Sequence, residues 1–115
     1  SGKIYYELFT ERNKRKLKEV YLVRIEQLYP FPSQSMMKEL SRFKNAKITW
    51  CQEEPRNQGG WFFVEPILEM ILSHISHGFK RADYAGRQSA ASPATGLAKQ
   101  HIEQQEKLID QALEV

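Results

Sequence analysis

The segment Val20-Tyr21-Leu22-Val23-Arg24-Ile25 decides the predicted fold class. β-Branched and aromatic residues are frequent in it, and its nearly continuous apolar character is typical of a strand covered on both faces in a parallel sheet. Pro30 and Pro32 follow, and they end regular structure because proline donates no backbone hydrogen bond and restricts the residue before it. We therefore expect a buried parallel strand here.

Helix and strand patterns alternate on both sides of this segment. The predicted helices cover residues 3–16, 33–43, 62–75 and 92–113, and the other predicted strands cover residues 46–51 and 80–85. Ser33 and Ser92 are the expected N-caps of their helices. The expected core residues are Ile25, Leu40, Trp50 and Leu68. The order α, β, α, β, α, β, α predicts an α/β fold with a mainly parallel sheet sandwiched by helices.

Length and composition indicate one small domain. At 115 residues the chain is too short for two separate cores, so residues 1–115 are expected to form a single domain. Hydrophobic residues make up 41% and charged residues 27%, which is typical of a soluble globular protein. Cys51 is the only cysteine, which suits a reducing compartment. No apolar run reaches the length of a membrane span, so we expect no membrane partner.

Five cations fall within seven residues near the end of the first predicted helix: Arg12, Lys14, Arg15, Lys16 and Lys18. They account for the net charge of +3. Such a cluster either binds an anion or nucleic acid, or complements the dipole at a helix end and stays in water. No aromatic residue lies within the run to stack on bases, so the second interpretation is favoured, and we expect no nucleic-acid partner.

The residues with reactive side chains form no known catalytic pattern. His74 and His77 lie three apart, but no third metal ligand follows at a recognisable spacing. Glu53 and Glu54 are adjacent, so in an extended segment they point to opposite sides and cannot form a facing acid–base pair. Cys51, at the end of a predicted strand, is expected to be a small core residue. We therefore predict no catalytic, cofactor-binding or metal-binding residue.

The loop expected over residues 52–60 ends in Gly59-Gly60, which let the backbone turn tightly before Trp61. It lacks the G-x-G-x-x-G spacing of a dinucleotide-binding turn. A contact loop, with Trp61 as an exposed aromatic residue, is the favoured interpretation.

Four blocks together resemble the C-terminal domain of the thiamine-diphosphate-dependent decarboxylases of 2-oxoglutarate dehydrogenase. The blocks are SGKIYY at residues 1–6, VRIEQLYPFP at residues 23–32, WCQEEPRNQG at residues 50–59, and YAGR at residues 84–87 followed by SAASPATG at residues 89–96. They occur in the family's order and at consistent spacing. The resemblance covers essentially the whole chain.

The resemblance implies a fold like the C-terminal domain of transketolase and a role in dimer assembly. In the family, the full enzyme is a homodimer that decarboxylates 2-oxoglutarate with thiamine diphosphate and Mg²⁺ and passes a succinyl unit to the lipoyl group of a succinyltransferase. The cofactor is held by the thiamine-binding domains that precede this one, so no cofactor and no catalytic residue is expected here, and the isolated fragment should be inactive. The cytoplasm of a bacterium, or the mitochondrial matrix of a eukaryote, is the implied location.

The family pattern also places an apolar strand directly before the Ser-Gly-Lys motif, inside the sheet. Because this chain begins at Ser1, we expect a fragment that lacks its first core strand. Such a fragment should self-associate, be only marginally stable, or be ordered only within the rest of the enzyme, because removing an inner strand exposes backbone groups of its neighbours. The alternative is that the strands around Val23 and Trp50 pair directly and give a compact monomer.

Two kinds of function remain open for the chain. The first is an assembly domain, whose contact residues with a partner or effector would be Glu53, Glu54, Arg56, Asn57, Gln58, Trp61 and Arg87. The second is a regulatory module, in which Arg56, Asn57, Gln58 and Arg87 hold a phosphate-bearing effector. The equivalent domain of 2-oxoadipate dehydrogenase is a further alternative, because the two families differ in substrate recognition upstream of this segment, and this segment separates them poorly.

Overall fold

The computed structural model describes residues 2–26, 28–87 and 98–113. In these ranges the elements are α1 (Gly2–Lys14), α2 (Ser33–Arg42), β1 (Thr49–Pro55), α3 (Trp61–His74), β2 (Asp83–Arg87) and α4 (Ala98–Ala112). All four predicted helices and two of the three predicted strands are present. None of the described helices is long and apolar enough to cross a membrane.

The two strands form a parallel sheet, as predicted. Thr49 pairs with Asp83 and Cys51 with Ala85, after which the register becomes irregular before the last pair, Pro55 and Arg87. The strand predicted over residues 46–51 therefore begins later and extends to Pro55, so Gln52, Glu53 and Glu54 belong to β1 and not to a loop.

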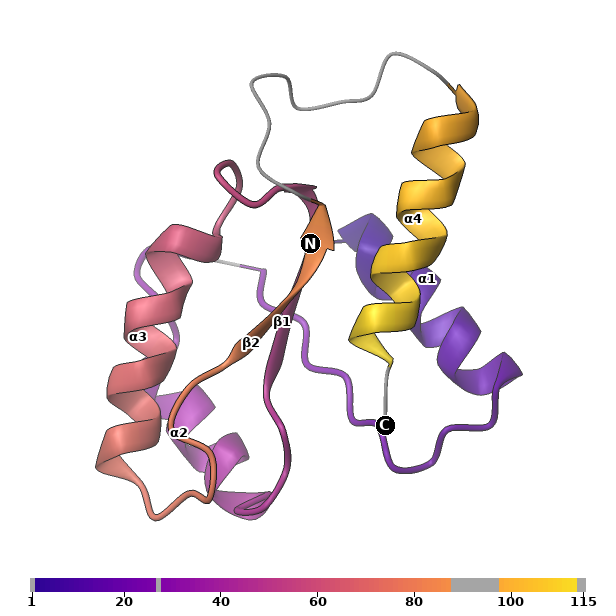
Figure 1. Cartoon of the computed structure of the whole chain (residues 1–115). Coiled ribbons are helices and arrows are strands. Elements are labelled where there is room, and N and C mark those ends of the chain that lie inside the picture. The colour runs from indigo at the N-terminus through magenta and orange to yellow at the C-terminus, as the bar shows by residue number, and fades with distance from the viewer. Residues whose placement is uncertain (1, 27, 88–97, 114–115) are drawn as a thin grey trace.

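Helices cover both faces of this sheet. Figure 1 shows β1 and β2 in the middle, with α2 and α3 on one side and α1 and α4 on the other. A first core joins α2 and α3, and Ile48, Trp50 and Tyr84 pack against it. A second core joins α1 and α4, with Cys51 packed against it. The prediction of a parallel sheet between helices is thus correct for the described residues, although the sheet has two strands.

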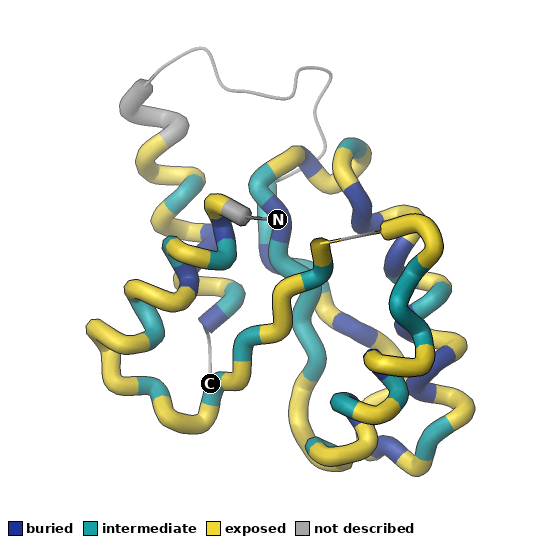
Figure 2. The backbone as a smooth tube through the Cα atoms, turned by 180° about the vertical axis from the view of Figure 1, so that it is seen from behind, coloured by how far each residue is buried: buried dark blue, intermediate teal, exposed yellow. Residues whose placement is uncertain are grey.

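The strand predicted over Val20–Ile25 is wrong. The segment has no regular secondary structure, and Tyr21 and Val23 are 56% and 45% exposed. Figure 2 shows it as a run of half-buried and exposed residues. The physical reason is that a strand exists only through a partner's backbone hydrogen bonds, and among the described residues β1 pairs with β2 alone.

Several finer predictions also need correction. Ser33 is the first helical residue, while Pro32 occupies the N-cap without a side-chain hydrogen bond; the expected cap at Ser92 lies outside the described residues. Leu40 and Leu68 are buried, as expected. Ile25 and Trp50 are only half-buried, because Ile25 lies on the segment that forms no strand and both residues line the cavity between that segment and β1. Phe62 and Phe63 lie on the exposed side of α3, so this helix is less deeply packed than its composition suggests.

Candidate functional site

A buried glutamine organises the turn that follows β1. Gln52 is 3% exposed, and its Nε2 donates to the carbonyl oxygens of Glu54 (3.1 Å), Pro55 (3.0 Å) and Gln58 (2.8 Å). Its Oε1 accepts from Trp50 Nε1 at 2.9 Å and from the backbone N–H of Trp61 at 3.1 Å. A single side chain therefore ties the end of β1, the turn and the first residue of α3 together.

The turn itself is tight. The N–H of Gln58 donates to the carbonyl of Pro55 at 2.8 Å, and Gly59 adopts a φ of +69°, the left-handed region that glycine enters without strain. A Cβ at Gly59 would lie 3.0 Å from the Cβ of Glu54. The turn is therefore fixed in shape. Arg56 and Asn57 are exposed on it, and Glu54 is exposed on β1 directly before it.

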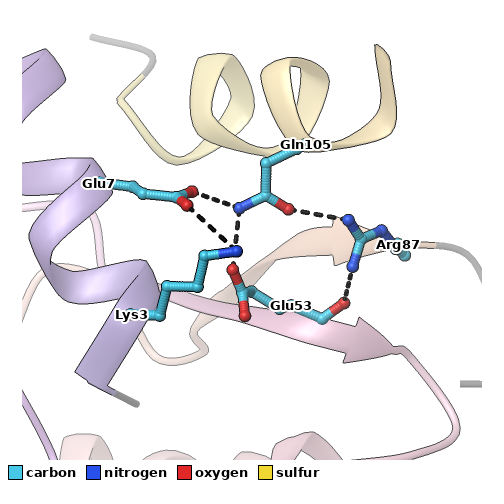
Figure 3. A network of polar contacts seen from close by, with 5 residues as sticks. All are labelled: Lys3, Glu7, Glu53, Arg87 and Gln105. Atoms are coloured by element: carbon cyan, nitrogen blue, oxygen red, sulfur yellow. Dashed lines mark hydrogen bonds and ion pairs between the residues drawn. The ribbon is translucent and has the colours of Figure 1, made fainter. Parts of the chain in front are cut away.

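A second network joins the carboxyl ends of the strands to both helices of the second core (Figure 3). Arg87 donates through Nη1 to the carbonyl oxygen of Glu53 at 2.6 Å and through Nη2 to Gln105 Oε1 at 2.8 Å. Gln105 Nε2 donates to Glu53 Oε1 at 2.9 Å and also to the carboxylate of Glu7. Lys3 Nζ lies 3.7 Å from the other oxygen of Glu7. The neutral amide of Gln105 thus joins both carboxylates to Arg87, and Lys3 pairs with Glu7.

Tyr84 connects the two networks. Its hydroxyl donates to the carbonyl of Arg87 at 2.8 Å, and the guanidinium of Arg56 lies 5.5 Å from its ring centre. Burial raises the pKa of the Tyr84 hydroxyl. The ring covers Gly86, where a Cβ would come within 2.6 Å of Tyr84 Cζ and 2.9 Å of the carbonyl oxygen of Gln52. Glycine is therefore required at position 86.

The predicted contact residues meet at one end of the sheet, but not all of them face outward. Trp61 is 1% exposed and packs against Tyr84 with ring centres 5.3 Å apart, so the expectation of an exposed aromatic residue is wrong. Its side chain belongs to the first core. Glu53 and Arg87 are half-buried in the second network. Glu54, Arg56 and Asn57 form the exposed part, which we call the turn surface.

Sequence reasoning missed the residues that hold this end of the sheet together. The sequence pattern predicts Gln52 in the loop without a role, and it does not mark Gln105, Glu7 or Lys3. The sequence carries a signal only for Gln52, because an uncharged polar residue between a tryptophan expected in the core and a turn is a candidate for a buried hydrogen-bonding role. Gln105 lies on α4, 52 residues after Glu53, and nothing local marks it.

The remaining reactive side chains have structural surroundings. Burial raises the pKa of the Cys51 thiol to about 12, so the thiol stays protonated at neutral pH. His77 lies beyond the end of α3 and is 4% exposed, and its Nδ1 accepts from the N–H of Phe79 at 3.0 Å. Within the part of the chain that the structure describes, no three His, Cys, Asp or Glu side chains are grouped to hold a metal ion.

Comparisons with known proteins agree with the resemblance in the sequence. A family model described as "2-oxoglutarate dehydrogenase C-terminal" matches residues 1–113. Curated proteins named 2-oxoglutarate dehydrogenase E1 component, from Brucella anthropi, Brucella ovis and Brucella canis, are each 53% identical to this chain over 113 residues. The match covers 98% of this chain and 11% of each relative, so the chain spans only a small part of the relatives' length.

Proposed function

The chain belongs to the 2-oxoglutarate dehydrogenase C-terminal family, and we propose on this basis that it is a non-catalytic assembly domain of the decarboxylase component. Its turn surface would contact a neighbouring domain or the second subunit of a homodimer. The full enzyme would decarboxylate 2-oxoglutarate, in the cytoplasm if the source is bacterial, and pass the succinyl unit to a lipoyl-bearing succinyltransferase. The relatives' name favours 2-oxoglutarate over 2-oxoadipate as the substrate.

One observation carries the proposal. Exposed residues of both charges, Glu54 at the end of β1 and Arg56 on the turn, lie beside Asn57, and Gln52 fixes this turn from inside. A surface whose backbone is already ordered loses little conformational entropy on binding, which is an advantage for an assembly contact.

The side chains at this end of the sheet do not fit thiamine diphosphate with Mg²⁺. The carboxylates of Glu7 and Glu53 accept hydrogen bonds from Gln105, and Lys3 and Arg87 lie on either side of them. Oxygen ligands engaged in this way are not arranged around a common point for a cation. The proposal therefore leaves the cofactor to the thiamine-binding domains upstream.

The test uses the full-length enzyme with Glu54, Arg56 and Asn57 all replaced by alanine. We expect the dimer dissociation constant, measured by analytical ultracentrifugation, to rise at least about tenfold, as for residues central to an interface. The matched control replaces Gln34, Lys38 and Glu69, which are exposed on α2 and α3 and change the charge equally. The assembly role would be refuted if the turn variant dimerised as the wild type does but had a slower chemical step at an enzyme concentration at which the dimer is fully formed.

A regulatory site is the second candidate, and one contact favours it. The backbone N–H of Arg56 donates to the carbonyl of Arg87 at 3.0 Å, which brings two arginines together beside Asn57 and Gln58. However, the Arg87 guanidinium already donates to Glu53 and Gln105. Calorimetric titration of the full-length enzyme with nucleotides and acyl-coenzyme A would test this candidate; saturable binding that is lost in Arg56→Ala would support it over the assembly role.

A further inference from the structure

Three segments at the amino end of the sheet concentrate positive charge. Residues 43–47 and 75–83 lead into β1 and β2, and residues 14–19 span the end of α1 and the loop after it. Figure 1 shows them at the end of the molecule away from the tips of the two strand arrows. They hold eight cations, which are Lys14, Arg15, Lys16, Lys18, Lys44, Lys47, Lys80 and Arg81. Glu19 and Asp83 are their only carboxylates, so their net charge is +6, whereas that of the whole chain is +3. We call this surface the basic end.

Contacts between the three segments make the basic end one surface. The backbone N–H of Gly78 donates to the carbonyl of Lys44 at 2.7 Å, which joins the loop after α3 to the loop after α2. Tyr21 follows the first segment closely in the chain, and its ring packs on that of Phe43 with ring centres 4.9 Å apart. The charges of all three segments therefore act together on an approaching molecule.

Most of these cations are not neutralised within the chain. Three of them form ion pairs at the surface: Arg15 with Asp110, Lys47 with Asp83 and Arg81 with Glu69. The other five are exposed, and no carboxylate of the described residues lies within ion-pair distance of them: Lys14, Lys16, Lys18, Lys44 and Lys80. The basic end therefore presents five ammonium groups that an external partner would meet first.

The dipole of α1 accounts for only part of this charge. The helix ends at Lys14, and the field of a helix dipole falls off within the last turn, so Lys16 and Lys18 lie beyond its reach. Lys16 also has a φ of 57°, a left-handed conformation that glycine adopts more readily than lysine. Lys44 and Lys80 lie outside the helices altogether. The cations of the basic end therefore need a further explanation.

The opposite end of the sheet is the one assigned to assembly. Gln105 Nε2 donates to both Glu7 and Glu53, so the first turns of α1 lie beside the carboxyl end of β1. The turn surface begins at Glu54, at the same end. A subunit or domain bound to the turn surface would thus leave the basic end open to another molecule.

The pattern of charges favours a protein as that molecule. Asp83 and Glu69 lie among the cations with side chains 61% and 49% exposed, and Glu19 is exposed beside Lys18. A nucleic acid or an anionic membrane presents negative charge throughout, so these three carboxylates would repel it. A protein surface carries both charges and has room to place its own cations opposite them. Lysine is also a point charge that suits single carboxylates, whereas arginine matches phosphate groups better.

We propose that the basic end is the docking surface for a separate acidic protein, whose carboxylates pair with the five free lysines. The ion pairs would stay exposed to water, so they would contribute mainly to the rate of encounter and make binding sensitive to salt. The contact therefore suits a partner that binds and leaves repeatedly. This inference goes beyond the proposed function and rests on it only in placing the assembly contact at the carboxyl end of the sheet.

The test measures binding of fluorescent poly-L-glutamate to the full-length enzyme at low salt, by anisotropy. The basic-end variant combines Lys16→Glu with Lys80→Glu. The matched control combines Lys38→Glu with Lys107→Glu, which lie exposed on α2 and α4 and change the charge equally. We expect the dissociation constant to rise at least about tenfold in the basic-end variant and less than about twofold in the control. A constant equal to that of the wild type in the basic-end variant, or an equal rise in both variants, would overturn the inference.

Two further probes separate the proposal from its alternatives. A single-stranded DNA oligonucleotide of the same charge and vesicles containing anionic phospholipid are titrated under the same conditions. Tighter binding of either probe than of poly-L-glutamate, lost in the basic-end variant, would overturn the inference in favour of a nucleic acid or a membrane. Added salt should weaken binding of poly-L-glutamate to the wild type more than to the variant.

A milder substitution covers a basic-end variant that fails to fold. Lys14→Gln with Lys44→Gln removes two positive charges without adding negative ones, and both side chains are exposed. We expect weaker binding of poly-L-glutamate with an unchanged midpoint in urea, and unchanged binding would overturn the inference. None of these results depends on the dimer measurement with the turn variant, so the two proposals fail separately.

Discussion

Replacing Gln52 by leucine should lower the free energy of unfolding by about 2–6 kcal/mol. The amide of Gln52 makes five hydrogen bonds, and two of them, to the Pro55 carbonyl and from the Trp61 N–H, are buried. Leucine leaves these two backbone groups without a partner, at about 1–3 kcal/mol each. The other three partners, Trp50 Nε1 and the carbonyl oxygens of Glu54 and Gln58, are only partly buried, so water replaces the lost hydrogen bonds and they add little to the cost.

The assay is urea denaturation followed by circular dichroism, in which the midpoint should fall while the slope stays constant. Gln34→Leu is the matched control, because Gln34 is exposed in the first turn of α2 and its replacement should change stability by less than about 0.5 kcal/mol. If Gln52→Leu were as stable as this control, the turn would not depend on the buried amide and the reasoning would be refuted.

Gln52→Glu adds a pH dependence with a defined sign. A carboxylate at this position would face the carbonyl oxygens that Nε2 now contacts, so burial and repulsion should raise its folded-state pKa above the unfolded value of about 4.3. The stability of this variant relative to the wild type should therefore be highest below about pH 4.3 and fall as the pH rises through the folded-state pKa. A deficit that is the same at pH 4 and pH 8 would show that the position is open to water.

Three further predictions concern single residues. Gly86→Ala should cost about 1–3 kcal/mol because the new Cβ would overlap the tyrosine ring packed over it, whereas Gly78→Ala, where the nearest atoms are 3.3 Å away, should cost less; equal midpoints in urea would contradict this. Leu68→Ala should cost about 2–5 kcal/mol and Met70→Ala, which is 48% exposed, less than about 0.5; similar losses would show that the face of α3 is misassigned. Burial raises the pKa of the Cys51 thiol to about 12, so this thiol should react with iodoacetamide at pH 8 only after unfolding. The free energy of unfolding should fall as the pH rises above about 8.5, the pKa of a cysteine in the unfolded chain. Alkylation of the folded chain at the rate of a free thiol would be the contrary result.

The sequence predicts the helices well because each one carries its own periodic signal. Leu40 on α2 and Leu68 on α3 lie on apolar stripes that a helix turns inward, and both are buried. The strand predicted at Val20–Ile25 has no such independence. Its composition is that of a strand, and its side chains alternate like those of a strand, but hydrogen-bonded pairing depends on a neighbour that composition does not reveal.

The candidate site was predictable only in part, for a related reason. Gly59 and Gly60 marked the turn, and charged residues around them suggested an exposed loop. The burial of Trp61 depends on its packing against Tyr84 of β2, and the role of Gln105 depends on α4 packing beside β1. Both follow from contacts between distant parts of the chain, which local patterns do not encode.

The alternation along β1 distributes its side chains between the two cores. Gln52 points its side chain toward the turn and the first core, Cys51 packs on the second core, and Glu53 joins the network that reaches α1 and α4. One short strand therefore connects the turn surface to the helices on both faces of the sheet. Since a two-stranded sheet is marginally stable without further strands or helix packing, the helices packed on its two faces are what hold the turn surface in place. Loss of the Gln52 amide should therefore loosen that surface even where the helices stay folded.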